Sequence, residues 1–451
     1  MTSMSSNHKP LFPVEKSLMS YWMKKRHSLA SFCSSNALPK QCDIAIIGTG
    51  MSGVATAYHI LSKPDTGLEQ PSVVLLEARQ ACSGATGRNG GHTKLATPVI
   101  HRLAETHGIE AAAQIVCHQL DQLTALKEVV DKEDIDCEFL STRSFDIFFD
   151  EKHAQQMYAF ISSEQAKGTP WVKEVQWIGK EQSDKITGVK NTKGALSVPA
   201  ASLWPYKLVT ELLSKVLDLG GQLYTETCVT AVKEKDNGET TLTTSRGLLT
   251  ARKTIFATNA YTAALLPQYE SIITPFKGQN SHLSPSPSFT PPMLLDNTYN
   301  LHFDSHYADY LIPRPDGTII LGGAKWTYEH DLKIWWNSVD DSTLINNETT
   351  THFDSVMADH FYGWENAAAQ HDMVWTGIMA STPDVLPHVG RIPGSKNQWI
   401  LAGFNGGGMI QIFTLTQAIA KMVTKGIEYD GTGLPELFKA TDARLAVRHQ
   451  K

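Results

Sequence analysis

Three glycines and one acid stand at the spacing that proteins use to bind a dinucleotide. The glycines of GTGMSG, residues 48–53, follow the apolar run CDIAII and precede a helical pattern. In this setting the first glycine makes a tight turn, the second lets the backbone approach a pyrophosphate, and the third packs helix on strand. An acid, Glu77, closes the next apolar run, where a carboxylate can bond a ribose hydroxyl pair. The residues predicted to form this part of the site are Gly48, Gly50, Met51, Ser52, Gly53 and Glu77.

A second glycine-rich segment, CSGATGRNGGH at residues 82–92, comes directly after that acid. We expect it to run along a pyrophosphate towards a flavin ring, with Arg88 offering positive charge to the phosphates and Asn89 bonding ribityl or phosphate oxygens. An ordinary exposed turn is the alternative interpretation. Because GxGxxG alone does not separate NAD from FAD, it is this segment that favours FAD. The residues predicted to bind the cofactor here are Ala78, Arg79, Gly84, Ala85, Thr86, Arg88, Asn89, Gly90 and Gly91.

The elements that would position these residues follow a strand, turn, helix, strand order over residues 42–77, which predicts a parallel sheet. Amphipathic helices are expected over 108–130 and from Pro205 to the Gly220–Gly221 pair. Strand, glycine turn and helix return at 398–423. The chain therefore predicts two interleaved modules, each visited more than once.

Composition excludes several classes of protein. The 451 residues carry a net charge of -6 and no basic tract, so a nucleic-acid partner is not expected. The six cysteines form no CxxC pair, which argues against a metal site and a disulfide framework. The uncharged stretch 397–420 contains three consecutive glycines and is interpreted as core, not a membrane span. With no signal pattern, transmembrane segment or C-terminal peroxisomal signal in the sequence, we expect a cytoplasmic protein.

Several separated motifs resemble those of the D-amino-acid-oxidase-like FAD oxidoreductases, the family of sarcosine, glycine and γ-glutamylputrescine oxidases. The resemblance covers about residues 20–426. The motifs that carry it are DIAIIGTGMSG, LLEARQACSGATGRNGGH, TCVTAV, KTIFATNAYT, ITPFKGQ, RPDGTIILGG, TPDVLPHVG and WILAGFNGGGM.

The resemblance implies a mixed α/β fold: a glutathione-reductase-type FAD-binding Rossmann domain interleaved with an antiparallel-sheet substrate domain that roofs the flavin. The chain would divide into an N-terminal arm, 1–40; an FAD-binding domain, 41–107, 199–270 and 371–451; and a substrate or cap domain, 108–198 and 271–370.

The resemblance also implies further cofactor contacts. Val229 would hold the adenine through its backbone, and Ala257 and Thr258 would line the dinucleotide groove. A helix start would face the flavin pyrimidine edge, where N–H groups stabilise the negative charge of a reduced flavin. Its residues would be Gly406, Gly407, Gly408 and Met409.

The activity implied by the resemblance is oxidation of a C–N bond in an amine or amino acid. Hydride passes from the carbon next to nitrogen to flavin N5, O2 reoxidises the flavin and gives H2O2, and the imine hydrolyses. One alternative is a dehydrogenase or tailoring oxidoreductase that acts on a secondary metabolite without O2. A redox-inert flavin-binding scaffold is another. The expected partners are a small amine or amino-acid-like substrate and O2, with no membrane, in a monomer or homodimer.

Two departures from the family pattern refine this expectation. Some relatives tether FAD through a late cysteine, but no cysteine follows Cys228 here, so non-covalent FAD is expected. The family's amino-acid oxidases place an arginine shortly before the TPDxxPxxG segment, where this chain has Met379. A missing arginine favours an amine over a simple α-amino acid. Arg314 could supply that charge, but its RPDG turn is expected to face solvent.

Three residues are candidates for catalytic roles. His92 ends the glycine-rich segment and could orient substrate or accept a proton, although a structural histidine is an equal alternative. Lys277 and Lys325 are candidates for the cation that helps O2 accept an electron, with a plain surface lysine as the alternative for each. Trp326, Tyr328, Trp335 and Trp336 could build an aromatic wall for a cationic amine, or simply fill the core.

Overall fold

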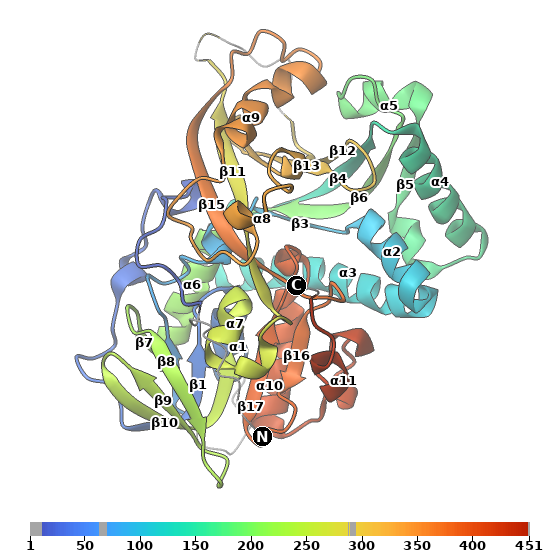
Figure 1. Cartoon of the computed structure of the whole chain (residues 1–451). Helices are drawn as coiled ribbons and strands as arrows, with labels where there is room; N and C mark the ends of the chain where they lie inside the picture. Colours follow the sequence, from blue (N-terminus) through green and yellow to red (C-terminus); the bar gives the residue numbers. More distant parts are fainter. Residues whose placement is uncertain (1–10, 63–69, 287, 289–294, 450–451) are drawn as a thin grey trace.

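Two β-sheets, one above the other in Figure 1, organise the computed structural model, which describes residues 11–62, 70–286, 288 and 295–449. The first sheet has the strand order β16-β17-β10-β1-β2-β7, and the second has β15-β11-β14-β13-β12-β4-β6-β3, with β5 beside β6. Chain segments far apart in sequence alternate between the two sheets.

The first sheet is built on β1, whose apolar residues are buried on both faces as expected of a parallel strand. Neighbouring strands β10 and β2 run parallel to β1, β17 to β10 and β7 to β2, whereas β16 runs antiparallel to β17. The bounds are β1 (Gln41–Ile47), β2 (Val73–Leu76), β7 (Gln222–Tyr224), β10 (Gly247–Phe256), β16 (His388–Arg391) and β17 (Gln398–Ala402).

Helices cover one face of this sheet and a small meander extends from it. Helix α1 lies against α6 and α10, and their apolar residues join those of β1 in one core cluster. Strand β9 pairs antiparallel with both β8 and β10. The bounds are α1 (Met51–Leu61), α6 (Pro205–Asp218), α10 (Ile412–Lys425), β8 (Val229–Glu234) and β9 (Thr240–Thr244).

The second sheet is antiparallel except for one pair, because β4 runs parallel to β12. Its two longest strands, β11 and β15, run from the upper part of Figure 1 towards the first sheet. The bounds are β3 (His92–Lys94), β4 (Leu140–Phe148), β5 (Gln176–Gly179), β6 (Gly194–Ser202), β11 (Thr274–Ser284), β12 (Thr298–His302), β13 (Ala308–Pro313), β14 (Ile319–Gly322) and β15 (Gln370–Ser381).

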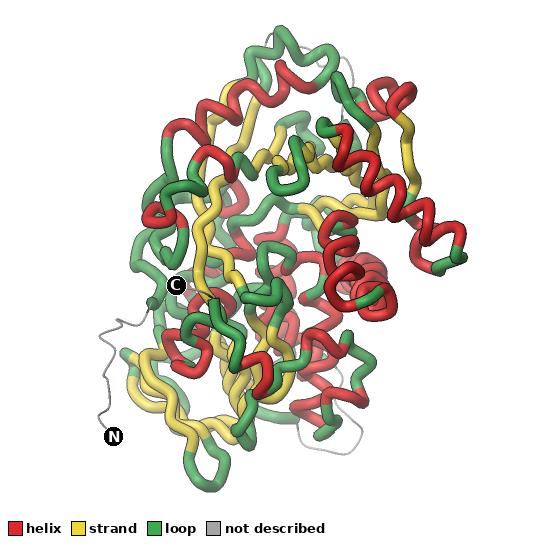
Figure 2. Tube along the Cα trace, turned by 45° about the vertical axis from the view of Figure 1, so that its right-hand side comes forward, coloured by secondary structure: helices red, strands yellow, loops and turns green. Residues whose placement is uncertain are grey.

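The two faces of the second sheet have different neighbours. We call inner the face that carries Asp146, Tyr310, Asn280 and Trp375, which fall in one row of the strand register. The outer face packs on α9 (Asn347–His360). Helices α2 (Thr97–His107), α3 (Ile109–Glu133) and α4 (Glu151–Ala166) contribute to the core cluster that includes inner-face residues. Figure 2 shows this layering, with the helices in red beside the yellow strands.

The remaining helices are short and lie in the connections between the elements above or near the two ends of the described chain. None of the helices in the described residues is long and apolar enough to cross a membrane. The short helices are α5 (Lys180–Thr187), α7 (Thr262–Leu265), α8 (Leu332–Trp335) and α11 (Asp442–Leu445), together with 3-10 turns such as Tyr21–Met23, Ala85–Gly87, Lys325–Thr327 and Gly408–Ile410.

The mixed α/β fold class predicted from the sequence is confirmed. The division of the chain into domain ranges stays a prediction, and three strands bear on its boundaries. The ranges assigned to the nucleotide domain include β3, the last four residues of β6 and all of β15 except its first residue, but all three strands pair within the second sheet. The arm residues Tyr21, Trp22 and Met23 are buried against the core. Most of the connection expected between α1 and β2, residues 63–69, lies outside the described residues.

Candidate functional site

The turn between β1 and α1 is closed too tightly for any side chain at Gly53. A Cβ atom there would lie 1.9 Å from the Gly48 carbonyl oxygen. Gly48 has φ +106, and a Cβ on it would lie 2.6 Å from the Ala257 carbonyl oxygen. The Gly48 N–H donates to Leu76 O at 2.8 Å, which ties the turn to β2. The predicted strand-turn-helix geometry of a dinucleotide site is therefore present.

The acid predicted to bind a ribose lies beside this turn. Glu77 Oε2 accepts hydrogen bonds from the Thr49 N–H at 2.9 Å and the Thr49 hydroxyl at 2.7 Å. Its Oε1 accepts from the Arg79 N–H at 3.0 Å. A carboxylate has about four acceptor sites, so Glu77 keeps capacity for hydroxyl donors. Ala78 lies between these two anchored residues.

The residues predicted to hold the adenine and to line the dinucleotide groove lie at the same edge of the first sheet. The Thr227 N–H donates to Glu77 O at 2.7 Å, which brings the start of β8 at Val229 close to the end of β2. The Ala257 N–H donates to Ile47 O at 3.0 Å. Thr258 follows, and its hydroxyl pairs with that of Thr262. Carboxyl ends of parallel strands are where open α/β sheets bind ligands.

The turn predicted to face the flavin is Gly406–Met409, directly after β17. A 3-10 turn, Gly408–Ile410, precedes α10, so the predicted helix start is a 3-10 turn and the α-helix itself begins only at Ile412. Met409 O accepts hydrogen bonds from the Thr93 hydroxyl at 3.1 Å and from Gln122 at 2.8 Å. These bonds fix the turn between β3 and α3, next to the end of the Cys82–His92 segment.

The Cys82–His92 segment contacts the first helix through one hydroxyl, and one of its own side chains braces it from within. Thr86 Oγ1 accepts from the Met51 N–H at 3.0 Å. Asn89 was predicted to reach cofactor oxygens, but its amide donates to Ala85 O and Thr86 O and accepts from the Gly91 N–H. Asn89 therefore shapes the loop from within.

The glycines of this segment also differ in what surrounds them. A Cβ on Gly90 would lie 2.6 Å from the Tyr310 ring, and one on Gly91 would lie 2.6 Å from the Trp22 ring. Close approach of protein side chains therefore explains these two glycines. Among the glycines predicted to bind the cofactor, Gly84 is the one where an added Cβ atom would have no neighbouring heavy atom within 4 Å. Gly84 is the position of the segment with room for a ligand.

Arg88 does not have the open surroundings predicted for a phosphate contact. Its side chain is buried, at 2% exposure, and its Nε and Nη1 donate at 2.9 Å to the carbonyls of Ser83 and Thr376. Nη2 donates to the Ser17 hydroxyl, and Asp341 lies 3.4 Å from Nε. Burial lowers the pKa of Arg88 to about 10, so the group stays charged at neutral pH. Its charge is used inside the protein.

The charge of Arg79 is also paired inside the protein. Its guanidinium makes a bidentate pair with Asp341, at 2.8 and 3.0 Å. Burial favours a lower pKa for Arg79, but the hydrogen bonds that its guanidinium donates to Asp341 outweigh that effect, and the pKa is raised overall. Asp341 lies in the connection between β14 and α9, so this pair ties the cofactor edge of the first sheet to the second sheet.

These surroundings can be tested against FAD, the cofactor predicted from the sequence. A glycine turn that excludes side chains, a carboxylate beside it and an unfilled position at Gly84 converge at one sheet edge. The residues present fit FAD at Gly48–Gly53, Glu77 and Gly84, and they do not need Arg79, Arg88 or Asn89 as side-chain ligands.

His92 lies on β3, and its ring centroid is 5.8 Å from that of Tyr310 on the inner face. Its Nδ1 is buried and has no hydrogen-bond partner. Burial, with a smaller contribution from Lys94, lowers the pKa of His92 to about 3. The imidazole is therefore neutral at physiological pH and can accept or donate one hydrogen bond.

Lys277 lies on the outer face of the second sheet. Side chains alternate along a strand, and Asn280 three residues later donates to Arg88 O from the inner face. Lys277 instead donates to the carbonyl and hydroxyl of Thr343, at 3.4 and 3.1 Å. Burial lowers its pKa. The sheet separates this ammonium from the loop that ends at His92.

Lys325 lies at the surface, with 49% of its side chain exposed and Glu329 Oε2 3.8 Å away. The predicted aromatic wall is divided: Tyr328 and Trp335 belong to a small core cluster against which Trp336 packs, whereas Trp326 packs against the outer-face core. Most of these rings therefore belong to the hydrophobic core, which was the alternative interpretation to an aromatic wall.

A buried polar cluster on the inner face was not predicted. Lys94 forms an ion pair with Asp146, and His302 Nε2 lies 3.3 Å from the same carboxylate oxygen. The other oxygen, Asp146 Oδ2, is buried without a hydrogen-bond partner. Burial raises the pKa of Asp146, but Lys94 and His302 outweigh that effect and lower it to about 2. The signal was the two-residue step from His92 to Lys94, which puts both on one face of a strand.

The surroundings of Met379 and Arg314 bear on whether a cation is available for a substrate carboxylate. Met379 lies on the inner face, with its sulfur 3.7 Å from where a Cβ of Gly406 would be, beside the predicted flavin turn. The expectation that Arg314 faces solvent is wrong. Its side chain is buried, pairs with Glu138, and lies over the ring of Trp22.

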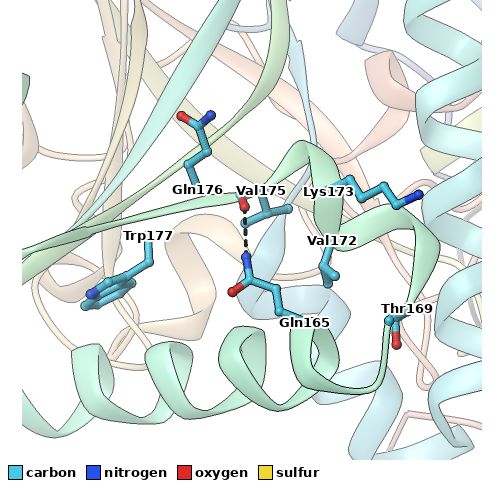
Figure 3. A pocket seen from close by; sticks show the side chains of 8 residues that line it. Gln165, Thr169, Val172, Lys173, Val175, Gln176 and Trp177 are labelled. Carbon is cyan, nitrogen blue, oxygen red and sulfur yellow. Dashed lines mark hydrogen bonds between the residues drawn. The ribbon is translucent and has the colours of Figure 1, made fainter.

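A surface pocket lies elsewhere, between the end of α4 and β5 (Figure 3). Gln165 spans it and donates to Val175 O at 3.4 Å, and Trp177 and Lys173 also line it. None of the predicted site residues lines this pocket. In the described part of the chain, no group of three or more histidine, cysteine or acidic residues is placed to hold a metal ion.

Comparisons with known proteins agree with this geometry. The family model described as FAD dependent oxidoreductase matches residues 43–423. Gamma-glutamylputrescine oxidoreductase of Escherichia coli is 21% identical over 414 residues, which cover 90% of this chain and 88% of that protein. Glycine oxidase of Pseudomonas putida is 24% identical over 217 residues, 46% of this chain and 53% of that protein.

Two solved structures show the likeness of fold. Glycine oxidase from Geobacillus kaustophilus superimposes with a TM-score of 0.71 at 19% identity, covering 90% of this chain and 99% of that one. L-proline dehydrogenase from P. horikoshii gives 0.69 at 20% identity, covering 89% and 98%. With the family model matching most of its length, the chain belongs to the FAD-dependent oxidoreductases of the D-amino-acid-oxidase family.

Proposed function

We propose that this enzyme oxidises a C–N bond of an amine, using FAD that is bound without a covalent tether. FAD, when bound, accepts the hydride that leaves the carbon next to nitrogen. The observation that carries the amine assignment is the charge pattern beside the predicted flavin loop. Among the described residues there, the cations have protein partners, whereas the carboxylate of Asp146 keeps one oxygen without any.

This pattern matters because a substrate carboxylate needs an available cation. Arg79 and Arg88 are committed to Asp341 and to backbone carbonyls, and Lys94 is committed to Asp146. Met379 lies where the family's amino-acid oxidases place an arginine. An amine, which offers N–H donors, suits the free acceptor at Asp146 better than a carboxylate does.

His92 is the residue we propose to orient the substrate. Its neutral ring can accept a hydrogen bond from an amine N–H through the unpaired Nδ1. A neutral histidine adds no positive charge of its own next to a bound amine. The printed names of the relatives, which include a gamma-glutamylputrescine oxidoreductase and a glycine oxidase, support small nitrogen-bearing substrates.

The electron acceptor that we propose is O2, with H2O2 as product. A dehydrogenase that uses another acceptor is the second candidate, and the position of Lys277 favours it. The two lysines first considered for oxygen activation lie on the outer face and at the surface. Lys94 is the remaining lysine candidate near β3. A monomeric or homodimeric state and a cytoplasmic location stay predictions.

The test of the proposed function starts with a panel of amines, N-methyl amino acids and D-amino acids added to the purified holoenzyme without oxygen. Amines should bleach the flavin absorption, and simple α-amino acids should do so much more slowly. Admission of air then separates the two candidates. Fast return of the yellow colour with stoichiometric peroxide supports an oxidase, whereas return over many minutes supports a dehydrogenase. Acid precipitation should leave the pellet colourless if FAD is not tethered.

A further inference from the structure

The N-terminal arm covers the Cys82–His92 loop at its two central carbonyls. We call residues 14–23 of the arm the clamp. The Ser20 hydroxyl donates to Gly87 O at 2.6 Å, and the Trp22 indole N–H donates to Asn89 O at 2.6 Å. The Trp22 ring also fills the space in which a Cβ of Gly91 would lie. These contacts reach the stretch of loop nearest to the predicted flavin position.

The clamp is itself held firmly by the rest of the protein. Trp22 is completely buried, its ring meets that of Trp204 edge to face at 5.5 Å, and its carbonyl accepts from the Trp204 indole at 2.8 Å. The Arg314 guanidinium lies 5.1 Å from the centre of the Trp22 ring. Tyr21 stacks on His282 of β11 at 4.0 Å. The clamp is therefore anchored on the second sheet and at the start of α6.

A second set of bonds connects the clamp to the charged pair beneath the loop. The Leu18 N–H donates to Asp341 O at 2.8 Å, and Arg79 Nη1 reaches Val14 O at 3.3 Å. Ser17 accepts from Arg88. The clamp and Asp341 together hold both arginines that follow Glu77, so the loop between them has little freedom to move.

The loop needs this support because it contains little regular structure of its own. A single 3-10 turn, Ala85–Gly87, is its only helical part, and β3 begins at His92. Glycine-rich backbone has a large conformational entropy to lose when it becomes ordered. If no other part of the protein ordered the loop, the cofactor would have to do so on binding, and its affinity would fall accordingly.

We infer that the clamp preorganises the Cys82–His92 loop for FAD, with Trp22 as the main positioning residue. Apparent affinity is proportional to the fraction of protein whose loop is already in the binding conformation, so it falls when that fraction falls. The inference rests on FAD as the family's cofactor and not on which amine is oxidised. Failure of the proposed substrate class would therefore leave it intact.

Trp22→Phe tests the inference, because it keeps an aromatic ring and removes the N–H that reaches Asn89 O. We expect the FAD dissociation constant, measured by titrating apoprotein with FAD, to rise on the order of tenfold. Trp171→Phe is the matched control. Trp171 is also buried, but its indole nitrogen has no partner and it lies in the Pro170–Glu174 turn, away from the loop. The FAD dissociation constant of Trp171→Phe should match that of the parent protein.

A second measurement separates preorganisation from a general loss of stability. In apoprotein, trypsin should cut after Arg88 faster in Trp22→Phe than in the parent or in Trp171→Phe, and added FAD should suppress the cut. Should Trp22→Phe fail to fold, Ser20→Ala replaces it, with Ser183→Ala as its control, since the Ser183 hydroxyl is buried without a partner. We expect Ser20→Ala to weaken FAD binding by a factor of a few.

The inference is overturned if the clamp variants that fold bind FAD within twofold of their controls. It is also overturned if tryptic cleavage after Arg88 is unchanged while thermal stability falls equally in Trp22→Phe and Trp171→Phe. That second result would make the clamp a structural brace only.

Discussion

The inner-face ion pair between Lys94 and Asp146 is the residue-scale feature on which our account depends most. Both side chains are buried, and the pair holds the only free carboxylate oxygen that we assign to substrate recognition. Burial of such a pair costs free energy, because both charges lose their hydration. Removal of one partner also destabilises the protein, because the other charge is left buried and uncompensated. Its energetics are therefore open to a direct test.

Lys94→Met should lower the free energy of unfolding by about 3–5 kcal/mol, since Asp146 would be left buried without its cation. Lys94→Met combined with Asp146→Leu should recover a large part of that loss. Urea unfolding of the apoproteins gives both values. A single variant as stable as the parent would show that the ion pair does not form, and the charge pattern behind the amine assignment would fail with it.

The sequence indicates the surroundings of a residue best where that residue contacts its own neighbourhood in the chain. Gly53 and Glu77 lie where their spacing indicated, because the turn and the strand that position them are local. Arg88 was predicted less well, since its partners come from residues 17, 83, 341 and 376. No local pattern reports contacts between segments so far apart.

At the scale of elements, glycine is needed for different reasons in the Gly48–Gly53 turn and in the Cys82–His92 loop. Gly53 lies inside α1, and its missing side chain lets the helix start press on Gly48 O. Gly84 has φ −79 and open surroundings. The first glycine is needed by the protein fold, whereas we attribute the second to the cofactor.

Gly53→Ala should therefore fail to give folded, FAD-binding protein, because a Cβ at 1.9 Å from a carbonyl oxygen cannot be accommodated without moving the helix. Gly84→Ala should leave the melting temperature of the apoprotein unchanged and weaken FAD binding on the order of tenfold. Thermal melts and FAD titration of the two variants check this. Parent-like FAD affinity in Gly84→Ala would place the cofactor away from that part of the loop.

The elements of the first sheet were largely predictable, because buried parallel strands and amphipathic helices have strong patterns. The helix expected over 108–130 is α3, and the helix expected from Pro205 is α6. The second sheet was less predictable. Its strand β3 has three residues, and its neighbour β6 lies about a hundred residues further along the chain. Pairings of that kind cannot be read from local periodicity.

At the scale of the whole molecule, buried histidines link stability to pH. His118 on α3 donates from Nε2 to Gln411 O at 3.1 Å, close to the predicted flavin turn. Burial lowers its pKa to about 4, although the bond to Gln411 opposes the shift. Burial is also the main reason that the pKa values of His92 and His388 are lowered, to about 3.

A histidine with a depressed pKa binds fewer protons in the folded than in the unfolded protein between the two pKa values. Stability should therefore fall as pH drops from about 6.5 towards 4. His118→Gln should remove up to about 1.4 kcal/mol per pH unit from that slope. Urea unfolding of parent and variant at pH 6.5, 5.5 and 4.5 measures it. Above pH 7.5 the two stability curves should run parallel, and parallel curves below pH 6 would contradict the buried position of His118.

The central claim is that an amine reduces flavin held at the Gly48–Glu77 edge beside His92. An anaerobic titration of the holoenzyme tests it most directly, with amines and simple α-amino acids added in turn and the visible flavin spectrum recorded. The account predicts bleaching at one equivalent of a suitable amine per flavin, with the bleaching weakened in an Asp146→Asn variant that still binds FAD. Bleaching by simple α-amino acids in preference to every amine, or equal bleaching in Asp146→Asn, would contradict it.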